Sequence, residues 1–141
     1  MSRPDRRVAI VPCSGIGKTY GSVSREAAYE LVEDLRPEST ELVALSLLVL
    51  GDGEARAVLA ASPAVTVDGC KLACATKMVK GSGGTVARAV DVLDAYRRNR
   101  HLKPRGIADL NEDGRTLAHV VAGELAEAVD RIRDGQGGDD A

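Results

Sequence analysis

Four segments of the chain have the hydrophobic pattern of β-strands. Three of them are nearly continuous apolar runs, which are typical of strands covered on both faces in a parallel sheet. These runs are "RVAIVP" (residues 7–12), "TELVALSLLVL" (residues 40–50) and "AVTVDG" (residues 64–69). The fourth, "TVARAVDVL" (residues 85–93), alternates as an edge strand does, although "ARAVDVLDAYRR" in the same region also fits a helix. The pattern therefore predicts a sheet of about four strands.

A segment with helical periodicity follows each of these strands. These segments are "SVSREAAYELVEDL" (residues 22–35), "EARAVLAAS" (54–62), "KLACATKMVKG" (71–81) and "DGRTLAHVVAGELAEAVDRI" (113–132). This alternation predicts a three-layer α/β domain of the Rossmann-like type, with a mostly parallel sheet and helices on both faces. We expect residues 1–133 to form this single domain, and the polar, glycine-rich residues 134–141 to form a disordered tail.

The composition excludes several classes of function. The formal net charge of −2 gives no electrostatic footprint for nucleic acid, and tyrosines are the only aromatic residues, so base stacking is not expected. No apolar stretch approaches the ~18 residues of a membrane span, and the N-terminus lacks the apolar region of a signal peptide. We therefore expect a cytoplasmic protein without a nucleic-acid or membrane partner. In a reducing compartment, its cysteines are more typical of metal ligands or reactive thiols than of a disulfide framework.

The three cysteines are expected to meet at one edge of the sheet. Cys13 follows the first strand and Cys70 follows the third, so both lie at carboxyl ends of strands, where open α/β sheets carry their sites. Cys74 is four residues beyond Cys70, so a helix over this segment would place both thiols on one face. The spacing favours a functional thiol cluster over the alternative of inert, buried cysteines.

Nearby groups suit negatively charged sulfur. Backbone N–H groups of the loop at residues 14–17, and of a helix beginning near Lys71, are expected to stabilise thiolates. Lys18 adds a positive charge close to the loop. Ser14 either binds a ligand anion or caps the next turn, and the sequence leaves both alternatives open.

The sequence also suggests roles for Asp68, Gly69 and the two histidines. Asp68 either donates an oxygen to a metal or caps the following helix, and capping is the favoured interpretation. Gly69 is expected to permit a tight turn from strand to helix. His101 and His119 are weak candidates for a further ligand, because a lone histidine is more often a surface or packing residue.

The stretch "VPCSGIGKTYG" (residues 11–21) also invites comparison with a phosphate-binding loop. Its Gly-Lys-Thr matches the end of G-x-x-x-x-G-K-[ST], but Pro12 stands where the first glycine belongs, and proline offers no N–H. The segment "LLVLGD" resembles the strand and acid that hold magnesium in such proteins. A degenerate nucleotide site is therefore a less favoured alternative to a cysteine site.

A thiol or persulfide redox protein is the main alternative function. Cys13 would be its reactive thiol, with Cys70 or Cys74 resolving it, although the chain has no CxxC motif. A regulatory or adaptor module with structural thiols is a third hypothesis. The sequence contains no pairing of nucleophile and base and no cofactor fingerprint, so it specifies no reaction.

Three segments carry a resemblance to a known family. "PCSGIGKTYGSVSREAAY", "LSLLVLGD" and "VDGCKLACATK" resemble the DGC domain, a family described as zinc-binding. The resemblance implies that Cys13, Cys70 and Cys74 bind a metal ion, most simply Zn²⁺. It also implies further cysteines in the second strand and before the third, but "VALSLL" (residues 43–48) and "SPAVTV" (residues 62–67) have none.

An open coordination position follows from this departure, because structural zinc is normally bound by four ligands. Water, Asp68, a histidine, an exogenous ligand or a group from a second subunit would complete the site. We therefore expect a role in metal sensing, metal transfer or accessory binding, with a protein partner or homo-oligomer as alternatives for the missing ligand.

Overall fold

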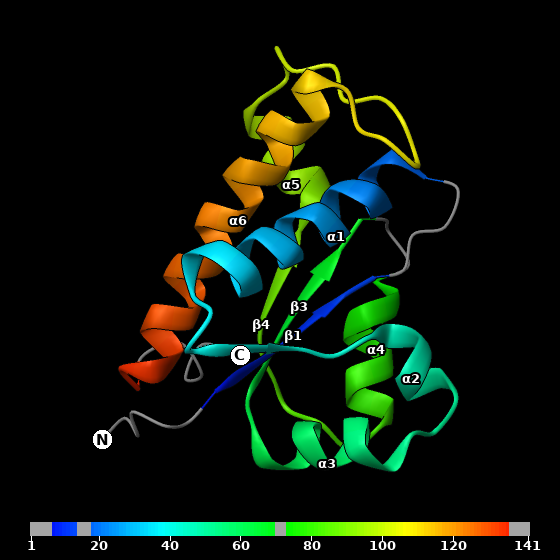
Figure 1. Ribbon diagram of the computed structural model, residues 1–141, viewed down its shortest axis with the longest axis vertical. Helices are drawn as coiled ribbons and strands as arrows, with labels where there is room; N and C mark the ends of the chain where they lie inside the picture. The colour runs from blue at the N-terminus through cyan, green and yellow to red at the C-terminus, as the bar shows by residue number, and fades with distance from the viewer. Residues whose placement is uncertain (1–6, 14–17, 70–72, 136–141) are drawn as a thin grey trace.

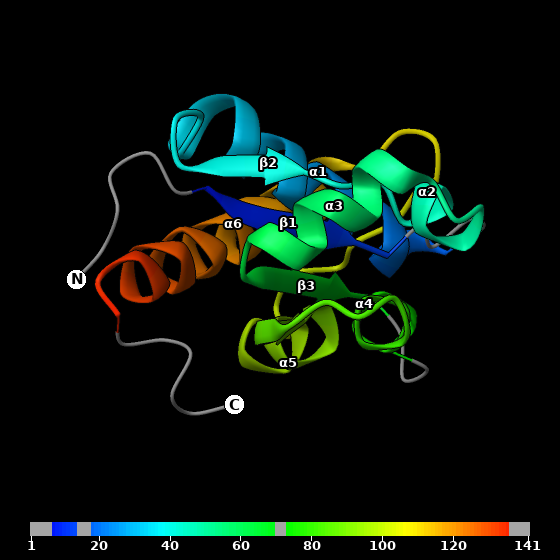
Figure 2. The same ribbon diagram turned by 90° about the horizontal axis from the view of Figure 1, so that it is seen from below.

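A four-stranded, wholly parallel sheet forms the centre of the fold. This computed structural model describes residues 7–13, 18–69 and 73–135. The strands are β1 (Val8–Pro12), β2 (Thr40–Leu42), β3 (Ala64–Asp68) and β4 (Val86–Asp91), in the order β2-β1-β3-β4. Figure 2 shows β2, β1 and β3 side by side in this order. The predicted α/β class and parallel sheet are confirmed.

Helices cover both faces of the sheet and make the three layers. One face carries α1 (Thr19–Glu30), its π-helical continuation η1 (Leu31–Leu35), α5 (Val92–Arg98) and α6 (Glu112–Arg133). The other face carries α2 (Leu45–Val49), α3 (Gly53–Ala61) and α4 (Cys74–Gly81). Figure 1 shows α6 and α4 on opposite sides of the strands. In the part of the chain that the structure describes, no helix is long and apolar enough to cross a membrane.

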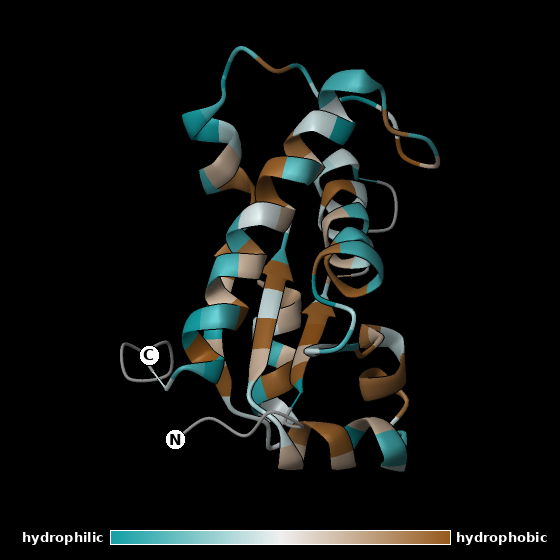
Figure 3. Cartoon of the chain, turned by 60° about the vertical axis from the view of Figure 1, so that its left-hand side comes forward, coloured by the Kyte–Doolittle hydropathy of each residue, from teal (hydrophilic) through white to brown (hydrophobic). Residues whose placement is uncertain are grey.

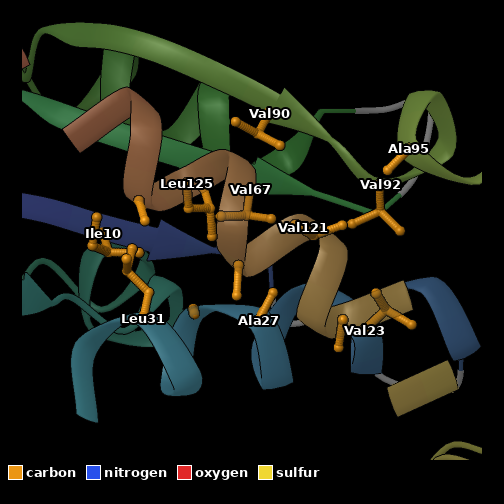
Figure 4. Close-up of a cluster of buried hydrophobic side chains, with 14 of the residues drawn as sticks. Ile10, Val23, Ala27, Leu31, Val67, Val90, Val92, Ala95, Val121 and Leu125 are labelled. Carbon is orange, nitrogen blue, oxygen red and sulfur yellow. The ribbon is translucent and has the colours of Figure 1, made fainter. Parts of the chain in front are cut away.

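The alternation of side chains along β1 divides the core into two apolar clusters. Val8 and Ile10 belong to the cluster under α1 and α6, whereas Ala9 and Val11 belong to the cluster under α2, α3 and α4. Figure 4 shows Ile10 in the first cluster together with residues of α1, β3 and α6. The strands are largely apolar, whereas α6 carries both apolar and hydrophilic positions (Figure 3). A strand buried on both faces thus explains each continuous apolar run.

The segment at residues 40–50 was expected to be one strand, and this prediction is wrong. Only Thr40–Leu42 is a strand, and α2 begins at Leu45. Leu45 and Leu48 are buried while Leu47 is exposed, which is a helical and not a strand pattern of burial. An almost wholly apolar run cannot reveal this change of period from its composition.

The other elements agree with the sequence more closely. α1, α3 and α6 match the expected helices at residues 22–35, 54–62 and 113–132, with shifted ends. Both interpretations of residues 85–98 are partly right, because edge strand β4 runs directly into α5. Asp91 separates the two, since its carboxylate accepts the Leu93 N–H at 2.8 Å and caps the helix. The expected tail at residues 134–141 lies largely outside the described residues.

Candidate functional site

The strand order reverses between β1 and β3, and this switch point lies at the predicted site. The chain moves from β1 outward to β2, and later from β3 outward to β4 on the other side. Ligands of open α/β sheets bind beyond the carboxyl ends of the strands at such a point. Cys13 directly follows β1, and its N–H donates to Val67 O of β3 at 2.8 Å. α1 and α4 both begin just beyond the tips of these two strands (Figure 1).

The sulfur of Cys13 is buried and has two polar neighbours. Only 3% of the residue is exposed. The Gly69 N–H donates to Sγ at 3.2 Å, and Ser24 Oγ lies 3.2 Å from the same sulfur. The predicted donors at residues 14–17, Ser14 among them, lie outside the described residues. These two polar partners were not predicted, because β3 and α1 bring them to Cys13 from 56 and 11 residues away.

Gly69 is constrained by close contact with the start of α1. A Cβ atom at this position would lie 2.5 Å from Tyr20 O and 2.8 Å from Gly21 N, both backbone atoms. Gly69 is not among the described glycines with positive φ. The need for glycine here follows from close approach and not from a positive φ, since only a residue without Cβ lets β3 and α1 approach this closely.

Asp68 caps α4, as the favoured interpretation of the sequence predicted. The residue is 4% exposed, and its Oδ1 accepts the Ala75 N–H at 2.8 Å. Its Oδ2 accepts the Thr76 N–H at 3.3 Å and the Thr76 hydroxyl at 2.7 Å. Thr66 of β3 adds a contact of 2.7 Å between its Oγ1 and that of Thr76. A buried polar network thus joins the end of β3 to the first turn of α4, and neither threonine was predicted to take part.

The helix that carries Cys74 begins later than the sequence suggested. A helix over residues 71–81 is wrong, because α4 begins at Cys74 and Ala73 has a left-handed backbone with φ 52°. Cys74 is exposed at the first position of α4. Cys70 lies outside the described residues. The left-handed Ala73 therefore interrupts the continuous helix that was predicted to place both thiols on one face.

The helix dipole of α4 also has a different partner from the one expected. The sequence predicts that a helix beginning near Lys71 stabilises thiolates. In the structure, Asp68 accepts the N–H groups of Ala75 and Thr76 in the first turn of α4. The N-terminal end of α4 therefore stabilises the negative charge of a buried carboxylate first.

Lys18 and Tyr20 lie at the start of α1. Lys18 is the exposed N-cap residue and makes no side-chain capping bond. The pKa of Tyr20 is raised, first by burial and then by the nearby Tyr96, whose ring centroid is 5.7 Å away. Tyr20 therefore remains neutral at pH 7 and adds no charge to the site.

The segment "LLVLGD" and the two histidines have other roles or positions in the fold. "LLVLGD" forms α2 and a turn rather than a strand, and Asp52 caps α3 by accepting the Ala55 N–H at 2.9 Å. His119 Nδ1 lies 2.6 Å from Glu30 at the far end of α1, roughly 16 Å along that helix from its start. His101 is exposed in the loop between α5 and α6. Among residues 7–13, 18–69 and 73–135, no group of three metal-binding side chains comes together.

A family model of the DGC domain matches residues 9–128, from β1 into α6. The chain belongs to the DGC domain family. Searches of curated proteins and of solved structures return no significant match.

The first two residues of the sequence Asp68-Gly69-Cys70 have separate structural roles in this DGC domain. Asp68 fixes α4, and Gly69 both allows the approach of α1 and donates its N–H to the Cys13 sulfur. The segment that lacks a further cysteine, residues 43–48, contributes Val43 and Leu45 to the apolar cluster that includes Cys13. Where the family resemblance implies a further cysteine, this DGC domain therefore has apolar side chains in the cluster that includes Cys13.

We predict that Gly69→Ala will lower the free energy of unfolding by about 1–3 kcal/mol, because the new methyl group overlaps the backbone of Tyr20 and Gly21. Urea denaturation in the presence of a chelator measures this effect without a contribution from metal. Gly123→Ala is the control, because position 123 is exposed on α6 and a Cβ there meets nothing within 4 Å; this change should stabilise the protein by up to about 1 kcal/mol. An unchanged stability of Gly69→Ala would show that the close contact is not a constraint.

We predict that Asp68→Ala will destabilise the metal-free DGC domain by about 1–3 kcal/mol, because three hydrogen bonds lose their buried acceptor. Asp91→Ala is a matched control, because it removes a helix cap from the register partner of Asp68 on β4. Chemical denaturation with chelator present compares the two. A loss for Asp68→Ala that appears only when metal is added would instead make this carboxylate a ligand.

Proposed function

We propose that this DGC domain binds a soft metal ion, most simply Zn²⁺, through the thiolates of Cys13, Cys70 and Cys74. The observation that carries the proposal is the buried Cys13 sulfur at the switch point, which accepts the N–H of Gly69, the residue next to Cys70. Membership of the DGC domain family supports the same function. The proposed role is metal sensing, metal transfer or accessory binding.

Gly69 before Cys70, and Ala75 and Thr76 after it, are each held by hydrogen bonds, which supports the proposal of a metal site here. Before it, Gly69 is held against the sulfur of Cys13 by its N–H. After it, Ala75 and Thr76 are held by the carboxylate of Asp68. The buried side chain of Asp68 therefore ties the end of β3 to the first turn of α4, which begins at Cys74.

The chemistry of the donors fits zinc. Cysteine thiolates are among its preferred ligands, and hydrogen bonds from outer groups orient such ligands and adjust their basicity. Cys13 has an N–H and a hydroxyl within hydrogen-bond distance of its sulfur. Because Asp68 is engaged in capping α4, we propose that the fourth position belongs to water, an exogenous thiol or anion, or a group from a partner protein or second subunit. Bound zinc would supply an exchangeable, electron-accepting centre for such a ligand.

Burial of Cys13 favours this proposal over a thiol or persulfide redox protein. Reactive thiols are typically partly exposed, since the sulfur must reach its reaction partner. Cys13 is only 3% exposed and belongs to an apolar cluster. A buried ligand combined with the exposed Cys74 suits a metal held at the edge of the sheet better than nucleophilic attack by Cys13.

The test is the metal content of protein purified without chelator and without nickel affinity, together with thiol titration. We expect about one zinc per chain and protection of the thiols until chelator is added. Cys13→Ser, Cys70→Ser and Cys74→Ser should each lower the metal content, while His119→Ala, which alters an exposed residue, should not. Protein without metal in which Cys13 is alkylated unusually fast would contradict the proposal and support the redox alternative.

A further inference from the structure

Ser24 is a buried hydroxyl that faces the sulfur of Cys13. It lies on α1 and is fully shielded from solvent. Its Oγ is 3.2 Å from Cys13 Sγ, 2.7 Å from Gly21 O and 3.4 Å from Cys13 O. A serine hydroxyl carries one hydrogen and two acceptor lone pairs, so these contacts cannot all use it as the donor.

The distances indicate how the hydrogens are arranged when Cys13 is a thiol. The contact with Gly21 O is the shortest, so the Ser24 hydroxyl donates to this carbonyl. Ser24 Oγ then accepts the S–H of Cys13 through a free lone pair. The Gly69 N–H donates to the same sulfur from the other side. In this arrangement every polar group around the thiol has a partner.

We propose that Ser24 is a positioning residue of the thiolate site and supplies a hydrogen bond to Cys13 when its sulfur binds metal. This inference rests on the proposed function. On metal binding, the hydrogen of the S–H leaves to solvent as a proton, and Ser24 turns its own hydrogen from Gly21 O to the sulfur. Gly21 O lies within α1, where the helical pattern supplies an N–H partner. The metal-bound sulfur would then accept from two donors, the Ser24 hydroxyl and the Gly69 N–H.

The location of Ser24 fits this role better than a purely structural one. A buried hydroxyl needed only for packing could satisfy itself with Gly21 O, three residues earlier on the same helix. Ser24 instead also contacts a side chain eleven residues away, on another element. Groups that hydrogen-bond to metal ligands typically change metal affinity by roughly 10–100-fold when removed.

Ser22 provides a matched control within the same helix. It is also a buried serine of α1, but its hydroxyl donates to the backbone oxygen of Ile107 at 2.5 Å. Ser22→Ala and Ser24→Ala therefore each remove one buried hydroxyl and leave a small cavity. Only Ser24→Ala removes a partner of the Cys13 sulfur.

The first measurement is zinc affinity of the full chain by competition with a chromophoric chelator. We expect Ser24→Ala to weaken binding by roughly 10–100-fold and Ser22→Ala to leave it unchanged. Ser24→Thr, which keeps a hydroxyl, should recover part of the loss. Equal losses of affinity in Ser22→Ala and Ser24→Ala would overturn the proposal, since general destabilisation would then explain both.

A second measurement needs no metal. In a Cys70→Ser/Cys74→Ser background, the Raman S–H stretching band reports the hydrogen bond of Cys13 alone. We expect Ser24→Ala to shift this band to higher frequency and Ser22→Ala to leave it in place. An unchanged band in Ser24→Ala would overturn the proposal whatever the affinities are. A shifted band in a protein whose parent binds no zinc would support the Ser24 contact and reject the metal-binding function, so the two failures are distinguishable.

Discussion

The close approach of Gly69 to the first turn of α1 is the contact on which the site depends. Backbone meets backbone there, with no space for a Cβ atom between Gly69 and Tyr20. The same approach directs the Gly69 N–H at the Cys13 sulfur and brings Ser24 to its other side. A sulfur buried between a strand end and a helix start is therefore a consequence of one glycine at the end of β3.

The buried carboxylate of Asp68 limits how much the helix dipole of α4 can stabilise other negative charges. It is satisfied by the N–H groups at the start of α4 and by the Thr76 hydroxyl. Since one negative charge already occupies this helix end, thiolates nearby gain less from its dipole. For Cys13, the described hydrogen-bond partners are instead a strand-end N–H and a serine hydroxyl. Hydrogen bonds to individual atoms thus replace the long-range field that the sequence suggested.

The sequence predicted the sheet and the position of the site better than it predicted the atoms around the sulfur. Continuous apolar runs identify β1 and β3, and the rule for parallel sheets places Cys13 at their carboxyl ends. The capping role of Asp68 follows from its position after a strand. Ser24 and Thr66 could not be predicted, because their contacts form only when α1 packs beside the end of β1 and α4 packs on β3. Likewise, the left-handed Ala73 has no signal in the sequence, since that conformation favours glycine.

The surroundings of Cys13 also limit the direction from which a ligand would complete the proposed site. On one side, Val43 and Leu45 belong to the same apolar cluster as the cysteine, and carbon atoms offer no coordination. On the side of α4, Cys74 is exposed at the first helical position. In the proposed site, an incoming thiol, anion or partner side chain would therefore arrive next to Cys74, while Cys13 remains the buried and hydrogen-bonded member of the set. This asymmetry suits a centre that exchanges a ligand at one face and keeps its position in the fold through the other.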